Sequence, residues 1–254
     1  MFYSRIFLFL FLLMTSSATF AVPTLDDESL SIKFATEANY FPFEYLDEQK
    51  QIKGFDIDIA NAICNAVNLT CSFHHQSFDS LLLTLQFGRF DAVIAALDIT
   101  EERLQQVDFS ESYYKNTSVF VSRNSAFEKF TIKDKFIGIQ ANSSNQAYLI
   151  KYAKEDSFII PYPSFSDAFD DLAKDRIDVV FADQAIVNDF LEKDDNEEHF
   201  SIHKEPENIF TAPFSEGYGI AIQKGNVVLQ QRLNSGLKII IENGSYQEIY
   251  NRYF

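Results

Sequence analysis

Stretches of strand character alternate with stretches of helix character along most of this chain. Apolar runs predict strands at 31–36, 91–96, 135–140, 158–162 and 177–182. Amphipathic patterns predict helices at 56–67, 81–87, 144–154, 167–174 and 184–191, with two more over 229–253 interrupted at Gly244. Because strands joined through helices pair in parallel, this alternation predicts an α/β fold with parallel or mixed sheets.

Two segments of the chain resemble each other. Residues 79–95 and 167–182 both run from a helix through a turn to a strand, and the turns lead into Arg-Phe-Asp-Ala-Val and Arg-Ile-Asp-Val-Val. The 254 residues suffice for one large domain or two smaller ones. The repeat favours two α/β lobes built on one plan, and chance similarity of two amphipathic units is the alternative.

The first 21 residues have the pattern of a secretory signal peptide. Arg5 supplies a positive start, residues 6–14 are apolar, and small residues lead to a cleavage site after Ala21. The apolar run is too short to span a bilayer comfortably, although a retained anchor is the alternative. We therefore expect an exported protein.

The chain contains two cysteines, Cys64 and Cys71. In an exported protein two cysteines favour one disulfide, here between a helix end and a strand, and two buried free thiols are the alternative. Neither cysteine has neighbours typical of a nucleophile or a metal site. The adjacent His74 and His75 point to opposite faces of an extended segment, so we expect no metal and no cofactor.

The net charge is −16 at pH 7. Such an acidic chain is a poor match for nucleic acid or an anionic membrane surface, because both carry negative charge. We expect neither as a partner.

A candidate anion site follows the predicted strand at 91–96. Thr100 is placed to cap a short helix, and Arg103 lies in its first turn. A guanidinium beside free backbone N–H groups can hold a carboxylate through two parallel hydrogen bonds. Asp98, in the same loop, can hold an ammonium. One loop therefore offers partners to both halves of an α-amino acid.

Polar and aromatic side chains also follow the other predicted strands. Glu37 and Tyr40 come after 31–36, residues 142–144 come after 135–140, and Asp183 comes after 177–182. Phe78 precedes a helix for which Ser77 is a plausible cap. In open α/β sheets ligands bind beyond the carboxyl ends of the strands, so we expect these side chains to converge.

Several motifs resemble one family. These are Glu-Ala-Asn-Tyr-Phe-Pro-Phe-Glu at 37–44, Gly-Phe-Asp-Ile-Asp at 54–58, Asp-Ile-Thr-Glu-Glu-Arg at 98–103, and Gly-Ser-Tyr at 244–246. In order and spacing they are similar to the polar amino acid binding proteins of bacterial ABC importers, solute-binding protein family 3. The Asp-Ile-Thr variant at 98–100 is most similar to the arginine-specific members.

The resemblance implies a two-lobe, type II periplasmic binding protein (Venus-flytrap) fold, with two sheets joined by two hinge strands. We place the crossings near 115–118 and 209–213. The first lobe then comprises 22–116 and the C-terminal return 211–254, and the second comprises 117–210. A disulfide similar to Cys64–Cys71 also occurs in the family.

Site roles carried over from the family are expectations at matching positions. Arg103, helped by Ser144, binds the ligand carboxylate, and Asp183, helped by Asp98, binds the ammonium. Tyr40 and Phe78 sandwich the ligand side chain, and Glu37 faces its cationic end. Backbone groups serve at Ala95 and Ala96, where many relatives have small polar residues or glycine. The complete expected set is Glu37, Tyr40, Phe78, Ala95, Ala96, Asp98, Arg103, Ser143, Ser144, Asn145 and Asp183.

The function implied is a periplasmic substrate-binding protein without catalytic residues. It captures L-arginine, or another basic amino acid, and delivers it as a monomer to the membrane permease of an ABC transporter. Two alternatives remain open at this point. One is a periplasmic dehydratase of the cyclohexadienyl dehydratase type on the same fold, and the other is an amino acid sensor.

Overall fold

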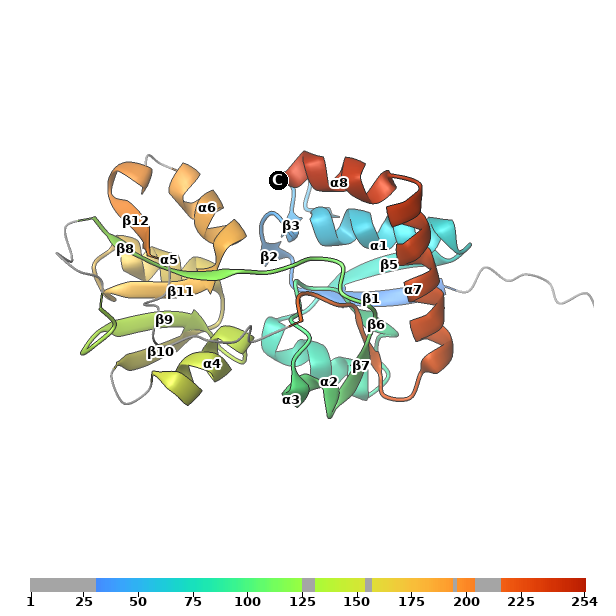
Figure 1. Ribbon diagram of the computed structural model, residues 1–254, viewed down its shortest axis with the longest axis horizontal. Coiled ribbons are helices and arrows are strands. Elements are labelled where there is room, and N and C mark those ends of the chain that lie inside the picture. The colour runs from blue at the N-terminus through green and yellow to red at the C-terminus, as the bar shows by residue number, and fades with distance from the viewer. Residues whose placement is uncertain (1–30, 125–130, 154–156, 194–195, 204–215) are drawn as a thin grey trace, which may run out of the picture.

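Two five-stranded sheets in separate halves of the molecule organise the chain (Figure 1). The computed structural model describes residues 31–124, 131–153, 157–193, 196–203 and 216–254. The signal peptide predicted at 1–21 and the crossing predicted near 209–213 lie outside these residues. Both sheets carry helices, so the predicted α/β class with mixed sheets is confirmed.

The first sheet has the strand order β5-β1-β6-β13-β7. Its strands are β1 (Ser31–Thr36), β5 (Thr70–His75), β6 (Ala92–Val93), β7 (Val107–Phe109) and β13 (Ala221–Gln223). Strand β1 pairs in parallel with β5 and β6, whereas β13 runs antiparallel to β6 and β7. The sheet therefore joins the N-terminal part of the chain to a strand that returns near the C-terminus.

The second sheet has the order β10-β9-β11-β8-β12. It consists of β8 (Ser118–Arg123), β9 (Phe136–Gln140), β10 (Phe158–Tyr162), β11 (Val179–Asp183) and β12 (Phe200–His203). Strand β9 pairs in parallel with β10 and β11, and β8 is antiparallel to β11 and β12. A small third sheet contains β2 (Asn39–Tyr40), β3 (Glu44–Leu46) and β4 (Ile52–Lys53).

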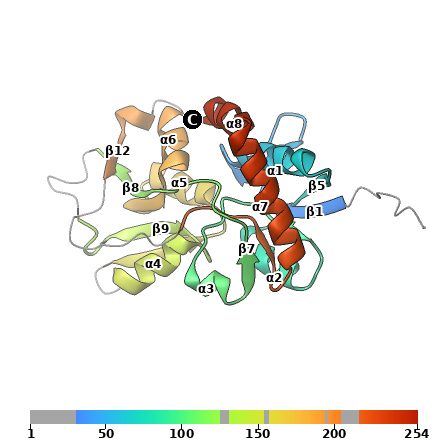
Figure 2. The same cartoon turned by 45° about the vertical axis from the view of Figure 1, so that its right-hand side comes forward.

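Helices cover both large sheets. They are α1 (Phe55–Ala66), α2 (Leu81–Gln86), α3 (Glu101–Leu104), α4 (Ser144–Tyr152), α5 (Phe165–Ala173), α6 (Gln184–Glu192), α7 (Val227–Glu242) and α8 (Ser245–Tyr253), with 3-10 turns at Phe78–Ser80 and Asn196–Glu198. Figure 2 shows α7 and α8 beside α1, on the same half as the first sheet. This half is thus completed by the C-terminal tail.

Close packing of α1 against α7 depends on a glycine. A Cβ at Gly236 would lie 2.8 Å from the carbonyl oxygen of Ile63, closer than such atoms can approach. Farther along the tail, the hydroxyl of Tyr253 donates to Asp58 Oδ2 at 2.8 Å. The tail is therefore held to α1 by close packing at Gly236 and by a hydrogen bond to the partly buried Asp58.

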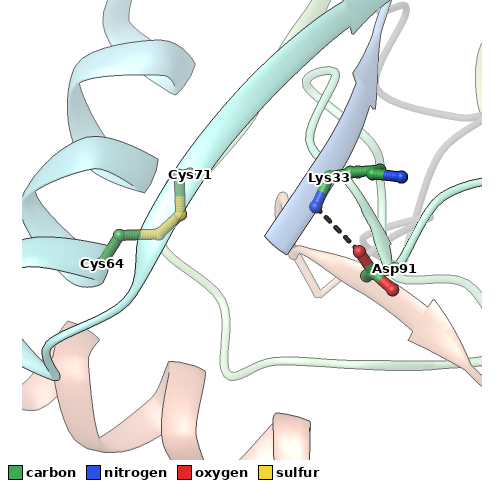
Figure 3. Close-up of a disulfide and its surroundings, with 4 residues drawn as sticks. All are labelled: Lys33, Cys64, Cys71 and Asp91. Carbon is green, nitrogen blue, oxygen red and sulfur yellow. Dashed lines mark hydrogen bonds between the residues drawn. A yellow bond between two sulfur atoms is a disulfide. The ribbon is translucent and has the colours of Figure 1, made fainter. Parts of the chain in front are cut away.

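The disulfide predicted between Cys64 and Cys71 is present (Figure 3). It joins the last turn of α1 to β5, with 6.3 Å between the two Cα atoms. The alternative of two free thiols is wrong. The same close-up shows the backbone N–H of Lys33 donating to Asp91 Oδ2 at 2.8 Å, which ties β1 to the turn before β6.

The predicted elements differ from the observed ones mainly at their ends. Strands 31–36 and 158–162 coincide with β1 and β10, whereas the strand predicted at 91–96 pairs only over Ala92–Val93. Its last residue, Ala96, has a φ of 43°, a left-handed conformation that no strand can contain. The helix predicted from 167 begins at Phe165, because the Ser164 hydroxyl accepts the Asp167 N–H and caps it.

Candidate functional site

A cleft lies between the two large sheets, at the carboxyl ends of their strands. It is lined by Glu37, Tyr40, Phe78, Ala95, Ala96, Asp98, Arg103, Gln140, Ser143, Ser144, Asn145, Phe165 and Asp183. Every residue of the expected ligand-binding set is in this lining, together with Gln140 and Phe165. Segments far apart in sequence therefore meet at one place, as the position of strand ends predicts.

Arg103 is buried in the cleft wall, with 8% of its surface exposed. It belongs to α3, a single turn whose cap is the predicted one: Thr100 Oγ1 accepts the Arg103 N–H at 3.3 Å. The guanidinium donates to the carbonyl oxygens of Asp98 at 3.0 Å and Asn142 at 3.3 Å, and lies 5.8 Å from the centre of the Phe78 ring. Burial lowers the pKa of Arg103, but an arginine keeps its charge at neutral pH.

Asp183 lies at the end of β11 and is 4% exposed. Its Oδ2 accepts the hydroxyls of Tyr40, at 2.6 Å, and of Tyr218. Its Oδ1 accepts the side chains of Asn116 at 2.8 Å and Ser118 at 3.0 Å. Although Asp183 occupies the N-cap position of α6, its side chain makes no cap hydrogen bond and turns toward the cleft instead.

Asp98 and the start of α4 face each other across the cleft. The Ser144 hydroxyl donates to Asp98 Oδ2, and Asp98 is 2% exposed. Ser143, unlike Ser144, caps the helix: its Oγ accepts the N–H of Gln146 at 3.1 Å at the start of α4. Asn145 Nδ2 reaches Ser118 Oγ at 3.3 Å. The first turn of α4 therefore contributes side chains to the cleft and is itself well capped.

Glu37 lies on the cleft wall and is 5% exposed. Gln140, at the end of β9, donates from Nε2 to Glu37 Oε2 at 2.8 Å. Burial raises the pKa of Glu37 to about 7, because the ionised form loses hydration, and the nearby Asp79 and Asp167 act in the same direction. The carboxyl group is thus easily protonated near neutral pH in this structure.

The aromatic residues of the cleft come from both halves. Tyr40, on β2, is 7% exposed, and its ring lies 5.9 Å from that of Phe165 at the start of α5. Phe78, in the 3-10 turn before α2, is half-buried. Ala95 and Ala96 complete the wall beside them with small side chains and backbone. The cleft therefore combines apolar surface with buried charge of both signs.

Five residues of the site or its support were not predicted as site residues from the sequence: Gln140, Phe165, Tyr218, Asn116 and Ser118. Gln140 is the last residue of the strand predicted at 135–140. The expectation that ligands bind at the carboxyl ends of strands identified Asp183, and it could have identified Gln140 as well. Phe165 and Tyr218 carried no such signal, since both stand in segments with unremarkable apolar patterns. Only the tertiary arrangement brings the Tyr218 hydroxyl to Asp183.

The described residues contain neither a metal-binding cluster nor a helix that could span a membrane. Within those residues, no three or more His, Cys, Asp or Glu side chains form a group able to hold a metal ion. Among the helices described above, none combines the length and apolar character needed to cross a membrane.

Comparison with known proteins places this arrangement in a family. The family model described as "Bacterial extracellular solute-binding proteins, family 3" matches residues 32–254. The ABC transporter arginine-binding protein 1 of Escherichia coli K12 is 37% identical over 224 residues, covering 88% of this chain and 90% of that protein. The arginine-binding periplasmic protein of Mannheimia haemolytica is 38% identical over 217 residues, covering 85% and 88%.

A solved structure agrees with this match. A periplasmic binding protein of Salmonella typhimurium, described for its high arginine specificity, superposes with a TM-score of 0.80 at 36% sequence identity. The superposition covers 89% of this chain and 99% of that one. The fold is therefore that of the type II periplasmic binding proteins, as expected. Since the family model spans nearly the whole described chain, the protein belongs to the bacterial extracellular solute-binding proteins, family 3.

Proposed function

We propose that this protein captures L-arginine, or a closely related basic amino acid, and delivers it to an ABC importer. The observation that carries the proposal is the set of buried charges in one cleft: three carboxyl groups, Glu37, Asp98 and Asp183, and one guanidinium, Arg103. The names of the arginine-binding relatives support the same ligand class.

The balance of these charges selects the ligand. Charges in a closed cleft are stable only when each has a complement, because a buried unpaired charge is costly. One guanidinium matches a single ligand carboxylate, Asp98 and Asp183 together match the α-ammonium, and Glu37 remains for a second cationic group of the ligand. Arginine, lysine and ornithine carry one carboxylate and two cations at neutral pH. Glutamine offers only one cation and leaves Glu37 without a charged partner.

The roles of the side chains follow from this match. Arg103 and Ser144 hold the α-carboxylate, and Asp183 with Asp98 holds the α-ammonium. The ligand side chain extends between Tyr40 and Phe78 toward Glu37, and a guanidinium between two rings gains on the order of 1–2 kcal/mol. Gln140 supports Glu37 from the opposite half of the molecule. Ala95, Ala96, Ser143 and Asn145 complete the site through backbone and side-chain contacts.

We assign the two halves to two lobes. Residues 22–116 and 211–254 form the first, and 117–210 form the second. The sheet orders support this division, since the first sheet takes strands from 31–109 and 221–223 and the second takes strands from 118–203. A ligand that touches both walls favours the closed arrangement, because it binds that arrangement more tightly than the open one.

The site of action in this proposal is the periplasm, reached through the signal peptide at 1–21. The periplasmic location in the printed name of the Mannheimia relative supports it. Delivery is to a membrane permease, and the binding protein acts as a monomer. N-terminal sequencing of the secreted protein tests the removal of the signal peptide. The mature protein should begin at Val22. A mature protein that retains residues before Val22 contradicts cleavage after Ala21.

Calorimetric titration of the purified protein tests the ligand. We expect L-arginine to bind most tightly among arginine, lysine, ornithine, histidine and glutamine. Tight binding of glutamine without binding of arginine contradicts the proposal. Arg103→Ala should nearly abolish binding of every amino acid, since each carries the same α-carboxylate. Arg89→Ala is the matched control, because Arg89 is exposed and remote from the cleft lining.

The contribution of Glu37 is tested separately. Glu37→Ala should weaken binding of arginine and lysine far more than that of glutamine, because only the basic ligands place a cation near this carboxyl. Equal loss for all ligands means that Glu37 has no role in recognising the side chain.

One observation favours a second candidate, a periplasmic dehydratase of the cyclohexadienyl dehydratase type. A carboxyl group with a pKa of about 7 inside a cleft, as Glu37 has, suits a general acid. Incubation with prephenate and arogenate decides between the two. Turnover that is lost in Glu37→Gln supports the enzyme, and its absence together with arginine binding supports the transport protein.

A further inference from the structure

Two buried carboxyl groups lie behind the cleft wall. Glu44, on β3, is 1% exposed, and Asp56, in the first turn of α1, is 0% exposed. They are brought together by the close approach of two backbones, in which the Asp56 N–H donates to the Phe43 carbonyl oxygen at 2.9 Å. Gly54 permits this approach, since a Cβ there would lie 2.9 Å from the Cα of Glu44.

The hydrogen bonds of this pair require a proton. The side chains of Glu44 and Asp56 lie close enough to each other to interact. Glu44 Oε2 and Asp56 Oδ1 are buried and have no hydrogen-bond partner among the described residues. Buried polar atoms without partners are rare and costly. A single proton between the two carboxyl groups satisfies both oxygens.

Asp56 is the better site for the negative charge. Its Oδ2 accepts the Ala96 N–H and the Tyr113 hydroxyl, each at 2.7 Å, and donors of this kind stabilise a carboxylate. Burial raises the pKa of Glu44 well above its usual range, and the charges of Asp56, Glu37 and Asp183 add to this effect. The pKa of Asp56 rises only to about 6, because its donors oppose the effect of burial.

The carboxylate of Asp56 is connected directly to the ligand cleft. Ala96, whose N–H it accepts, lines the cleft and has a φ of 43°. This left-handed conformation costs an L-residue roughly 1 kcal/mol, so it persists only where contacts hold it. Asp98 follows two residues later on the same wall. The orientation of Asp56 therefore determines the path of the loop that carries Asp98.

We propose that Glu44 is a neutral carboxylic acid that donates its proton to Asp56, and that this pair positions the Ala96–Asp98 wall of the cleft. Glu44 and Asp56 are positioning residues, since neither is in the cleft lining. The effect on ligand affinity rests on the proposed function, whereas the protonation of Glu44 does not. The two parts therefore have separate experiments.

Infrared spectroscopy tests the protonation. At a pH of about 8, exposed carboxyl groups and Glu37 are ionised and do not give the carbonyl band of a protonated acid. A band of this kind at that pH therefore comes from a group that stays protonated, such as Glu44. We expect the wild-type minus Glu44→Gln difference spectrum to contain this band. The wild-type minus Glu37→Gln difference spectrum should lack it. Absence of the band from the Glu44→Gln difference overturns the proposal, whatever the protein binds.

Arginine affinity tests the positioning role. Glu44→Gln keeps a donor facing Asp56, so we expect a Kd within about 3-fold of wild type. Glu44→Ala leaves Asp56 Oδ1 without a donor and should weaken binding at least about 10-fold in the folded protein. Ile249→Ala, on α8, is the control for lost stability and should leave the Kd unchanged. If Glu44→Gln weakens binding 10-fold or more, the proposal is overturned. This test remains decisive even if Glu44→Ala does not fold.

Discussion

Each acidic residue of the cleft receives a hydrogen bond from the opposite half of the molecule. Gln140 donates to Glu37, Ser144 donates to Asp98, and Tyr40 donates to Asp183. Such pairs hold carboxyl oxygens in place without neutralising them, so the group can still receive a ligand cation. Burial raises the pKa of Glu37 to about 7.

This shift predicts that arginine binding depends on pH through Glu37. Below about pH 7 the carboxyl of the free site is protonated, and a ligand cation requires the ionised form, so binding must release the proton. We expect the affinity to fall roughly 25-fold as the pH is lowered from about 7.5 to about 5.5. Calorimetry near pH 7 in buffers of different ionisation enthalpy measures the released proton.

The isosteric variant Glu37→Gln supplies the control for this prediction. It removes the titrating group, so its affinity should be lower at pH 7.5 and nearly independent of pH. If the variant retains the wild-type pH dependence, the proton comes from another group. Asp56, with a pKa of about 6, is then the next candidate.

At the scale of elements, the turn at the start of α1 depends on the backbone conformation of Gly54. Gly54 has a φ of 130° and a ψ of 176°, a combination available essentially only to glycine. A Cβ at this position would also meet the carbonyl group of Phe43. The turn and the approach of β3 to α1 therefore depend on the same residue.

Gly54→Ala should destabilise the protein strongly. We expect a loss of at least about 3 kcal/mol in the free energy of unfolding, from backbone strain together with steric overlap. Gly225→Ala is the matched control, since Gly225 also has a positive φ, 82°, but has open space around it. It should lose only about 1 kcal/mol. Urea unfolding measures both, and equal losses would show that overlap at Gly54 is unimportant.

The disulfide between α1 and β5 leads to a second prediction about elements. Its cysteines are 7 positions apart in sequence, so the closed loop is short. The double variant Cys64→Ala, Cys71→Ala should lose about 2 kcal/mol in the free energy of unfolding, mainly because the unfolded chain gains freedom. Neither cysteine is in the cleft lining, so the arginine Kd should not change. A large change in Kd would reveal coupling between this crosslink and the cleft.

At the scale of the whole molecule, the cleft exists only because two sheets face each other. The chain leaves the first sheet after β7, builds the second with β8 to β12, and returns with β13 (Figure 1). Direct hydrogen bonds join the two halves, among them Arg103 to the Asn142 carbonyl oxygen. A ligand that binds both walls adds to these contacts and therefore stabilises the closed form.

Saturating arginine should make the protein more compact and more stable. We expect a smaller radius of gyration by small-angle X-ray scattering, since opening of the lobes becomes rarer. We also expect about 2.7 kcal/mol of added stability at a ligand concentration 100 times the Kd. Arg103→Ala, treated in the same way, should change neither quantity. An unchanged radius of gyration when calorimetry shows saturation would contradict ligand-induced closure.

Most long, regular segments could be predicted from the sequence, although the six-residue strand β8 (Ser118–Arg123) was not among the predicted strands. The bounds of the short strands could not be predicted. Strands β1 and β10 coincide with their predicted ranges, because five or six residues suffice for an apolar pattern to emerge. Strands β2, β4 and β6 contain two residues each, too few for any periodicity. Their pairing is decided by partners distant in the chain, as when Ala92 pairs with both Phe34 and Ile222.

The sequence by itself determined the α/β class, the disulfide, the capped turn that carries Arg103 and the side chains expected at the strand ends. These features depend on neighbours in the chain or on local periodicity, which one sequence displays. Only the tertiary structure decided that Gln140 bonds to Glu37, that the Tyr218 hydroxyl reaches Asp183, and that Glu44 lies against Asp56. Each of these contacts joins segments that come together only through packing of the sheets and helices, and burial at two of them raises the pKa of Glu37 and of Glu44.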